Sequence, residues 1–148
     1  MRPVLKRRNV SGRNVPGVNL PGAAKPFRPA HRKISPSTRS IEMMVEQGWI
    51  AENVEQWLPR TKIRRDLFGF ADLVAIKPEH KPLLIQVTTT DNMAARRRKI
   101  LAEPRAIIAL LGGFDIVLHG WIKPSKTIFE FRARVQYLSM EDFTNQKE

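Results

Sequence analysis

The sequence contains no cysteine. This absence excludes a disulfide framework, a thiol nucleophile and a cysteine-ligated zinc site, and it fits a reducing compartment. No run approaches the roughly 18 consecutive apolar residues that a membrane-spanning helix needs, and no apolar segment follows the basic N-terminus as in a secretory signal. With 148 residues, the chain is long enough for one domain with its own hydrophobic core. We therefore expect no membrane association and a cytoplasmic location, in the host cytoplasm if the protein is viral.

Acidic residues are missing from residues 1–41, which hold ten of the 26 Lys and Arg residues and none of the 14 Asp and Glu residues. Most of the net charge of +12 therefore belongs to the N-terminal part of the chain. Residues 1–36 are also rich in Pro, Gly and Asn, so they cannot bury enough apolar surface to offset the entropy of ordering. We predict a basic flexible arm over 1–36 that binds phosphates without reading sequence, or else a solubilising tail or a segment that docks on a protein partner.

The remaining residues, 37–148, alternate between helical and strand patterns. Ser37 is expected to cap a first helix of about three turns, which ends near Gly48. The patterns then predict strands over 54–57, 70–76 and 83–89, helices over 93–103 and 106–111, strands over 114–122 and 128–138, and a short polar tail from Ser139. This order predicts an α/β domain whose mainly antiparallel central sheet is flanked by helices.

Two polar side chains interrupt the apolar strands at the centre of the chain. Asp72 lies in FADLVAI and Gln86 lies in LLIQVTT. Burying such groups without partners costs several kcal/mol, and antiparallel pairing of the two strands would bring them together. Carboxylate, amide and carbonyl oxygens are the ligands that Mg²⁺ prefers, and the Val87 carbonyl could add one more. The sequence therefore predicts that Asp72, Gln86 and Val87 share a divalent metal ion.

Other side chains could complete this site. Glu42 on the first helix could bring a second carboxylate, although a solvent-facing glutamate is the ordinary alternative. Asp66 is either a further ligand or a turn residue. His119 lies between apolar residues of a strand, which indicates a core histidine with a satisfied side chain rather than a general base. His31 and His80 are expected to be solvated.

Two basic clusters adjoin the predicted site. One precedes the Asp72 strand and the other lies on the helix after Gln86. Each could be a solvated surface, or could bind the backbone of DNA. The predicted DNA-binding residues are Arg60, Lys62, Arg64, Arg65, Arg96, Arg97, Arg98 and Lys99.

The phrase RDLFGFADL over residues 65–73, followed by Gln86-Val87-Thr88, resembles the PD-(D/E)XK nuclease superfamily. The resemblance covers roughly residues 38–122 and includes a preceding helix with Glu42 and a following basic helix. Restriction endonucleases, archaeal-type Holliday junction resolvases and many phage enzymes belong to this superfamily. The resemblance implies a restriction-endonuclease-like αβββαβ core with a central mixed sheet flanked by helices, dependence on Mg²⁺ or Mn²⁺, and cleavage of DNA.

The catalytic residues that this resemblance implies are Glu42, Asp72, Gln86, Thr88 and Lys99. Gln86 stands where the second acidic ligand is usual. Thr88 stands where the motif lysine is expected, and Lys99 on the next helix is a candidate substitute for it.

The sequence therefore predicts a magnesium-dependent DNA endonuclease, with selectivity for DNA structure as one form of it. A two-fold dimer would suit the cutting of both strands. A catalytically weak or inactive nuclease-fold protein that binds DNA or has a structural role in a virion is the alternative. An RNA-binding protein is a third interpretation, but the predicted sheet lacks the interleaved aromatic residues of a stacking platform.

Overall fold

The computed structural model of the chain describes residues 34–127 and 130–147, so the predicted basic arm lies almost entirely outside the described residues. The helices are α1 (Pro36–Glu46), α2 (Met93–Leu101), α3 (Pro104–Leu111) and α4 (Met140–Thr144), with 3-10 turns η1 (Thr90–Asn92) and η2 (Asn145–Lys147). The strands are β1 (Ile50–Asn53), β2 (Gln56–Leu58), β3 (Ile63–Arg65), β4 (Leu73–Ile76), β5 (Leu83–Thr89), β6 (Asp115–Ile122) and β7 (Arg132–Leu138). Within the described part of the chain, no helix has the length and apolar character needed to cross a membrane.

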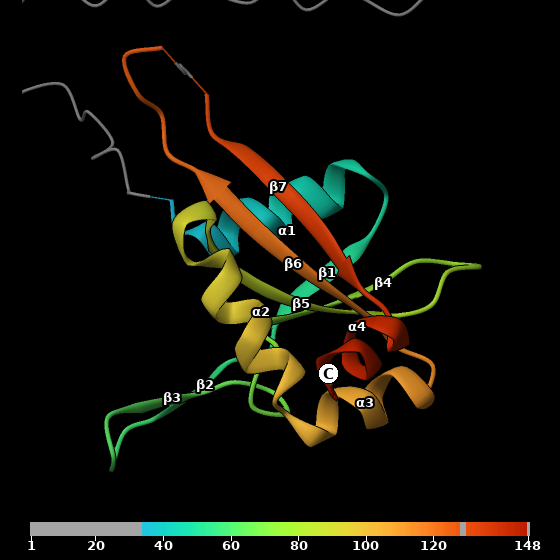
Figure 1. The fold of residues 1–148 in the computed structure, drawn as a ribbon. Helices are drawn as coiled ribbons and strands as arrows, with labels where there is room; N and C mark the ends of the chain where they lie inside the picture. The colour runs from blue at the N-terminus through green and yellow to red at the C-terminus, as the bar shows by residue number, and fades with distance from the viewer. Residues whose placement is uncertain (1–33, 128–129, 148) are drawn as a thin grey trace, which may run out of the picture. The chain divides into compact units, whose positions relative to one another are not determined.

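Five strands form one mixed sheet in the order β1-β4-β5-β6-β7 (Figure 1). β5 and β6 run parallel, while the other neighbouring pairs are antiparallel. β2 and β3 form a separate antiparallel hairpin. The prediction of an α/β fold with a mixed sheet and flanking helices is confirmed.

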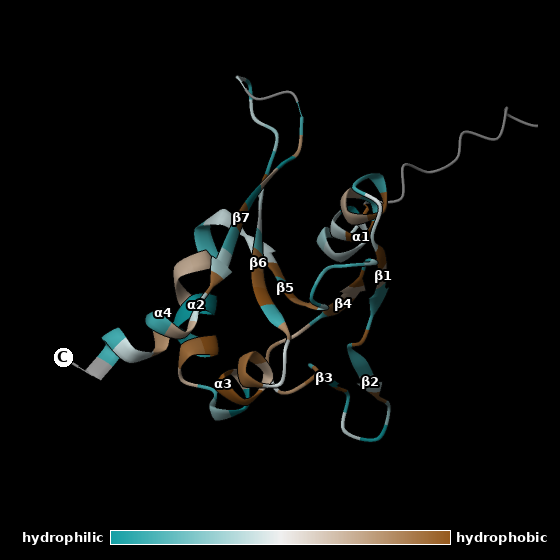
Figure 2. Cartoon of the chain, turned by 90° about the vertical axis from the view of Figure 1, so that its right-hand side faces the viewer, coloured by the Kyte–Doolittle hydropathy of each residue, from teal (hydrophilic) through white to brown (hydrophobic). Residues whose placement is uncertain are grey.

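Helices cover both faces of the sheet, with α1 on one side and α2, α3 and α4 on the other (Figure 2). Alternate residues of each strand point to opposite faces. Leu84 of β5 therefore packs in the core beneath α2 and α3, whereas Ile85 and Val87 pack in the core beneath α1. Because β5 is buried on both faces, its first three residues and Val87 are apolar, and Gln86 and Thr88 are its buried polar residues.

The start of α1 differs from the prediction by two residues. Ser35, not Ser37, is the N-cap, and its hydroxyl accepts a hydrogen bond from the backbone N–H of Thr38 at 3.1 Å. Pro36 occupies the first helical position, where its fixed φ suits a helix and its missing N–H costs nothing. α1 therefore buries Ser40 and Met44 against the sheet.

The strand predicted over 54–57 begins two residues too early, because β2 runs from Gln56 to Leu58, and β1 at Ile50–Asn53 was not predicted. β1 ends at Asn53, whose side-chain oxygen accepts a hydrogen bond from the N–H of Glu55 at 2.8 Å. This local bond is a typical asparagine turn, and it separates β1 from β2. β4 likewise begins at Leu73 rather than Phe70, because residues 67–71 form a turn in which Gly69 has a φ of +79°. Asp72 consequently lies just before its strand.

The C-terminal tail is not merely polar, because Ser139 starts the short helix α4 with a capping box to Asp142. Phe143 of α4 is buried in the core, and Arg97 of α2 donates to Asp142 Oδ1 at 2.7 Å. A five-residue helix carries too little periodicity to be recognised in the sequence. Other helix and strand ends also differ: α2 ends at Leu101 and β7 begins at Arg132.

Gly120 allows α2 to pack closely against β6. A Cβ atom at this position would overlap the side chain of Met93 at the start of α2. We expect Gly120→Ala to destabilise the protein by about 1–3 kcal/mol, the usual cost of overpacking. Urea unfolding measures this loss, and adding Met93→Ala should recover part of it because the truncated side chain clears the overlap. Strictly additive losses in the double variant would contradict this packing.

Candidate metal-binding site

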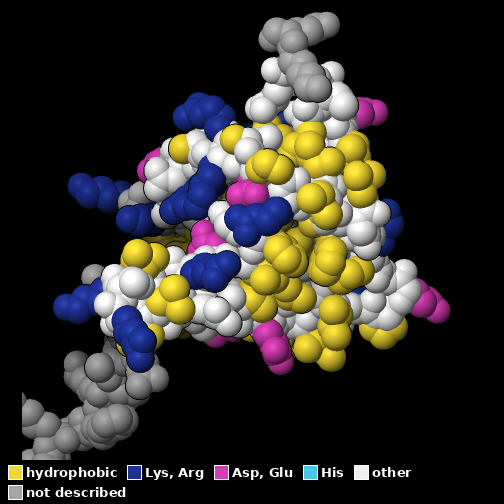
Figure 3. Space-filling model, turned by 90° about the horizontal axis from the view of Figure 1, so that it is seen from below, with side chains coloured by type: hydrophobic (Ala, Val, Ile, Leu, Met, Phe, Trp, Pro, Cys, Tyr) yellow, Lys and Arg dark blue, Asp and Glu magenta, His cyan; other side chains and the backbone are white. Residues whose placement is uncertain are grey.

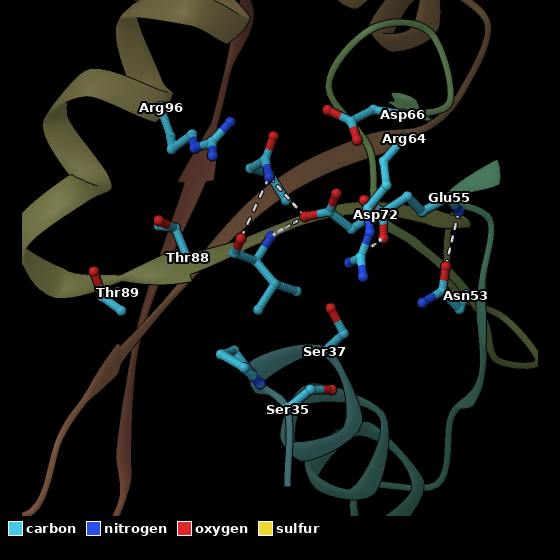
Figure 4. A pocket seen from close by; sticks show the side chains of 13 residues that line it. Ser35, Ser37, Asn53, Glu55, Arg64, Asp66, Asp72, Thr88, Thr89 and Arg96 are labelled. Atoms are coloured by element: carbon cyan, nitrogen blue, oxygen red, sulfur yellow. Dashed lines mark hydrogen bonds and ion pairs between the residues drawn. The ribbon is translucent and has the colours of Figure 1, made fainter. Parts of the chain in front are cut away.

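Polar side chains from both helical layers and the sheet meet in one open hollow of about 340 Å³ at the carboxyl end of β5. Figure 4 shows Arg96 of α2 on one side of it, Ser35 and Ser37 of α1 on the other, and Asp72 between them. The lining residues are Ser35, Pro36, Ser37, Asn53, Glu55, Arg64, Asp66, Asp72, Gln86, Val87, Thr88, Thr89 and Arg96.

Asp72 and Gln86 are in direct contact, as their strand positions predict. Gln86 Nε2 donates to Asp72 Oδ2 at 2.6 Å and to the carbonyl oxygen of Val87 at 3.3 Å. The N–H of Val87 also donates to Asp72 Oδ2 at 2.8 Å. The predicted proximity of Asp72, Gln86 and Val87 is confirmed. It arises because β4 and β5 pair antiparallel with Leu73 opposite Ile85.

In the described part of the chain, only the nitrogen of the Gln86 side-chain amide has hydrogen-bond partners. The side chain is 2 % exposed, and its Oε1 has no hydrogen-bond partner among the described residues. A buried polar atom without a partner costs about 1–3 kcal/mol, so its presence in a natural core needs an explanation. Rotation of the amide would turn this oxygen toward Asp72 Oδ2 and the Val87 carbonyl, an arrangement that a cation between the three oxygens would stabilise.

Three carboxylates gather beside this amide. Glu55, Asp66 and Asp72 each have an oxygen atom within 4.8 Å of the others (Figure 4). Asp66, for which the sequence left both a ligand and a turn role open, therefore lies at the site. Glu55 was not predicted, because the strand predicted over 54–57 placed it inside a strand, whereas it lies just before β2 at the foot of the β2–β3 hairpin. The only feature of the sequence that marks Glu55 is its position just before residues 56–65, which are rich in basic and in large apolar side chains.

The electrostatics of the hollow favour a cation. The pKa of Asp72 is raised from 3.8 to about 6, mainly by burial and also by the nearby charges of Asp66 and Glu55, while the hydrogen bond from Val87 and the charge of Arg96 oppose the rise. Two basic side chains also pair with the cluster. Arg64 lies 3.6 Å from Glu55 and Lys99 lies 3.5 Å from Asp66.

Glu42 does not line this hollow, contrary to the prediction that it would supply a ligand. It is exposed and lines a different hollow, with Arg39, Glu46 and Phe131 among its neighbours. The reason is helical geometry, because Glu42 lies two positions, about 200°, from both buried residues of α1. The first turn of α1, rather than its middle, reaches the site.

The other predicted catalytic residues lie at or near the hollow. Thr88 is 8 % exposed and lines the hollow. Lys99 does not line it, but contacts it through the ion pair with Asp66. Arg96, one turn earlier on α2, lines the hollow directly. Arg96 is therefore the α2 cation best placed to meet a ligand there.

The predicted DNA-binding residues fall into two groups. Arg60, Lys62, Arg64 and Arg65 are all exposed on the β2–β3 hairpin, and Arg98 and Lys99 are exposed on α2. Arg97 is instead half-buried and pairs with Asp142 of α4. Figure 3 shows that Lys and Arg side chains gather around acidic ones on one face of the molecule, with a broad hydrophobic area beside them.

His119 is confirmed as a core histidine. Its side chain is 1 % exposed, and its Nδ1 lies 3.0 Å from Ser40 Oγ, which also accepts a hydrogen bond from Trp121 Nε1 at 2.9 Å. Burial lowers the pKa of His119 from 6.5 to about 4. A neutral, buried histidine that bonds Ser40 on the α1 face of the sheet and does not line the hollow cannot serve it as a general base.

The donor atoms of the hollow are all oxygens, which are the ligands preferred by hard divalent cations such as Mg²⁺ and Mn²⁺. No family model matches the chain, and no curated protein or solved structure matches it. What the hollow does must therefore be inferred from its own chemistry: three carboxylates, a buried amide oxygen without a partner and nearby guanidinium groups.

Proposed function

We propose that the protein is a magnesium-dependent DNA endonuclease of the PD-(D/E)XK type. The observation that carries the proposal is the meeting of Glu55, Asp66 and Asp72 within 4.8 Å beside the buried amide of Gln86, whose Oε1 has no partner among the described residues and would face Asp72 Oδ2 after rotation of the amide. An acidic cluster alone is common on protein surfaces. A neighbouring buried amide whose oxygen lacks a donor is not, and a bound cation would satisfy all of these oxygens together.

The order of elements supports the same proposal. The series α1, β1, β4, β5, α2 and β6 would form the αβββαβ core of a restriction-endonuclease-like fold, with the β2–β3 hairpin and α3 as additions to it. In that core, Asp72 lies just before β4 and contacts Gln86 in the middle of the adjacent strand β5, and the resemblance expects the metal ligands on these two neighbouring segments.

In the proposed site, Asp72, Gln86 Oε1 and the Val87 carbonyl would hold the metal ion, and Glu55 or Asp66 would complete the set in place of Glu42. A bound Mg²⁺ or Mn²⁺ would supply an activated water and relieve charge on the scissile phosphate. The residues around it have separate tasks. Arg96 would position a phosphate oxygen by hydrogen bonding, and the hydroxyl of Thr88 would hold a water or phosphate oxygen at the edge of the hollow.

The alternative function is DNA binding without efficient cleavage. It is favoured by Thr88, which cannot supply the positive charge of the motif lysine. Among the described residues, no lysine lines the hollow, and its cations are Arg64 and Arg96. A guanidinium stabilises phosphate charge but does not deprotonate to activate water, so cleavage by this site is expected to be slow.

Cleavage of plasmid and branched DNA in Mg²⁺, Mn²⁺ and EDTA tests the proposal. We expect metal-dependent products that Asp91→Asn leaves unchanged, because Asp91 is exposed and does not line the hollow. Tight DNA binding with no cleavage in either metal would favour the alternative. The absence of both binding and cleavage would overturn the two functions together.

Gln86→Glu should tighten magnesium binding by about tenfold, because it adds a fourth carboxylate and ligand charge governs affinity for hard cations. Without metal, the same change should destabilise the protein, since the new carboxylate would lie against Asp72 Oδ2, where Nε2 now donates at 2.6 Å. Calorimetric magnesium titration and metal-free thermal unfolding measure the two effects. Unchanged magnesium affinity would remove Gln86 from the ligand set.

A further inference from the structure

The β2–β3 hairpin projects from the site and has an unusual composition. Residues 56–65 contain four basic residues and no acidic one. The hairpin also exposes large apolar side chains: Trp57 is 56 % exposed, Ile63 is 58 % exposed and Leu58 is 38 % exposed. It stands apart from the main sheet (Figure 1), with which its strands do not pair. Such a segment contributes little to the core, so its composition calls for another explanation.

Trp57 lies on the face of the hairpin that continues into the hollow at the carboxyl end of β5, which is the proposed metal site and is called the metal hollow below. It lines a second hollow together with Asn53, Glu55 and Arg64, and these three residues also line the first one. Arg64 is the cross-strand neighbour of Trp57 and lies 3.6 Å from Glu55. An exposed indole, a guanidinium and the acidic cluster therefore follow one another along a single surface.

We infer that Trp57 and Arg64 form a stacking site for an unpaired nucleotide of the DNA strand that enters the metal hollow. This inference rests on the proposed function and adds to it the kind of DNA recognised. Aromatic side chains stack on bases of any sequence, and arginine adds phosphate contacts and cation–π attraction. A paired base presents only its edges in the grooves, so a stacking residue of this kind selects single-stranded or distorted DNA.

The order of the groups along this surface suits this role. Trp57 is two residues from Glu55, and Arg64 pairs with Trp57 across the hairpin and lies 3.6 Å from Glu55. A base stacked on Trp57 would therefore belong to a nucleotide close to the phosphate at the metal, with Arg64 placed to contact the backbone between them.

Binding measured in Ca²⁺ or EDTA tests the inference without requiring hydrolysis. The full-length protein is titrated with a labelled duplex and with the same duplex carrying a single-stranded overhang. Trp57→Ala should weaken binding of the overhang probe by about tenfold, as expected from loss of one base stack, and should change duplex binding little. Trp57→Phe should retain most of the preference. Tryptophan fluorescence should be quenched by the overhang probe in the natural protein and much less in Trp57→Phe.

Ile63→Ala is the matched control, because Ile63 is as exposed as Trp57 and lies on the same hairpin, but does not line the hollow with Glu55. It should leave the preference for the overhang unchanged. Equal losses on both probes, or quenching that survives in Trp57→Phe, would overturn the inference while leaving the endonuclease proposal standing. A change in sedimentation with unchanged DNA affinity would also overturn it, in favour of a protein interface. If Trp57→Ala weakens binding of the overhang probe but the natural protein cleaves no DNA in Mg²⁺ or Mn²⁺, the inference is supported and the endonuclease proposal is refuted.

Discussion

Asp72→Asn is expected to reduce magnesium-dependent cleavage to background and, at the same time, to stabilise the metal-free protein. The loss of cleavage follows from the loss of the central carboxylate, which lies within 4.8 Å of both Glu55 and Asp66 and contacts Gln86 at 2.6 Å. Asparagine has nearly the same shape, so the change removes the charge and leaves the packing intact.

The gain in stability follows from the raised pKa of Asp72. In the folded protein this pKa is about 6, against a usual value of 3.8. At neutral pH the ionised side chain is therefore more costly in the folded than in the unfolded state, by up to about 3 kcal/mol. In the Asp72→Asn variant, the side-chain amide oxygen could still accept the hydrogen bonds from Val87 N–H and Gln86 Nε2. We expect a net stabilisation of about 1–3 kcal/mol in EDTA at pH 8.

Urea unfolding with and without magnesium measures both effects. Magnesium should stabilise the natural protein by RT ln(1 + [Mg²⁺]/Kd) and should have no effect on Asp72→Asn. Asp91→Asn, which removes an exposed carboxylate outside the hollow, is the control and should behave like the natural protein. A destabilised Asp72→Asn, or one that magnesium still stabilises, would contradict the assignment of Asp72 as a metal ligand.

The centre of the site was predictable from the sequence for a simple reason. Isolated polar residues in two apolar strands that follow one another must be satisfied, and antiparallel pairing leaves Asp72 and Gln86 as each other's nearest partners. The same reasoning identified His119 as a core residue. These predictions depend on strand periodicity and burial, which local sequence reports well.

The periphery of the site was not predictable in this way. Glu55 and Asp66 come together because the chain leaves the sheet after β1, forms the β2–β3 hairpin and returns before β4. The asparagine turn at Asn53 and the left-handed turn at Gly69 set that path, and neither has a clear hydrophobic period. Glu42 was wrongly included because helical position relative to the buried residues, not mere presence on α1, decides which side chains reach the site.

The stability of the natural protein between about pH 4 and pH 6 should depend little on Asp72 and His119 together, because their contributions oppose one another. Asp72, with its raised pKa, binds a proton more tightly in the folded state, so its contribution falls as the pH rises from 3.8 to about 6. His119, with its pKa lowered from 6.5 to about 4 by burial, binds a proton more tightly in the unfolded state. Its contribution therefore rises with pH over nearly the same interval.

Substituting Asp72 or His119 should reveal the pH dependence of stability that the other residue contributes. Asp72→Asn should lose stability on acidification below pH 6.5, with a slope of up to about 1.4 kcal/mol per pH unit, because the contribution of His119 is then no longer opposed by that of Asp72. His119→Gln, whose amide can still bond Ser40 Oγ, should show the opposite trend and be most stable at low pH relative to the natural protein. Asp142, whose pKa is lowered mainly by its hydrogen bond with Ser139, is present in all three proteins, so its contribution cancels in the differences between them.

Unfolding free energies in EDTA from pH 4 to pH 7 provide the comparison. Parallel curves for the three proteins would show that the burial of Asp72 and His119 does not shift their proton affinities, and would remove the electrostatic basis for a cation at Asp72.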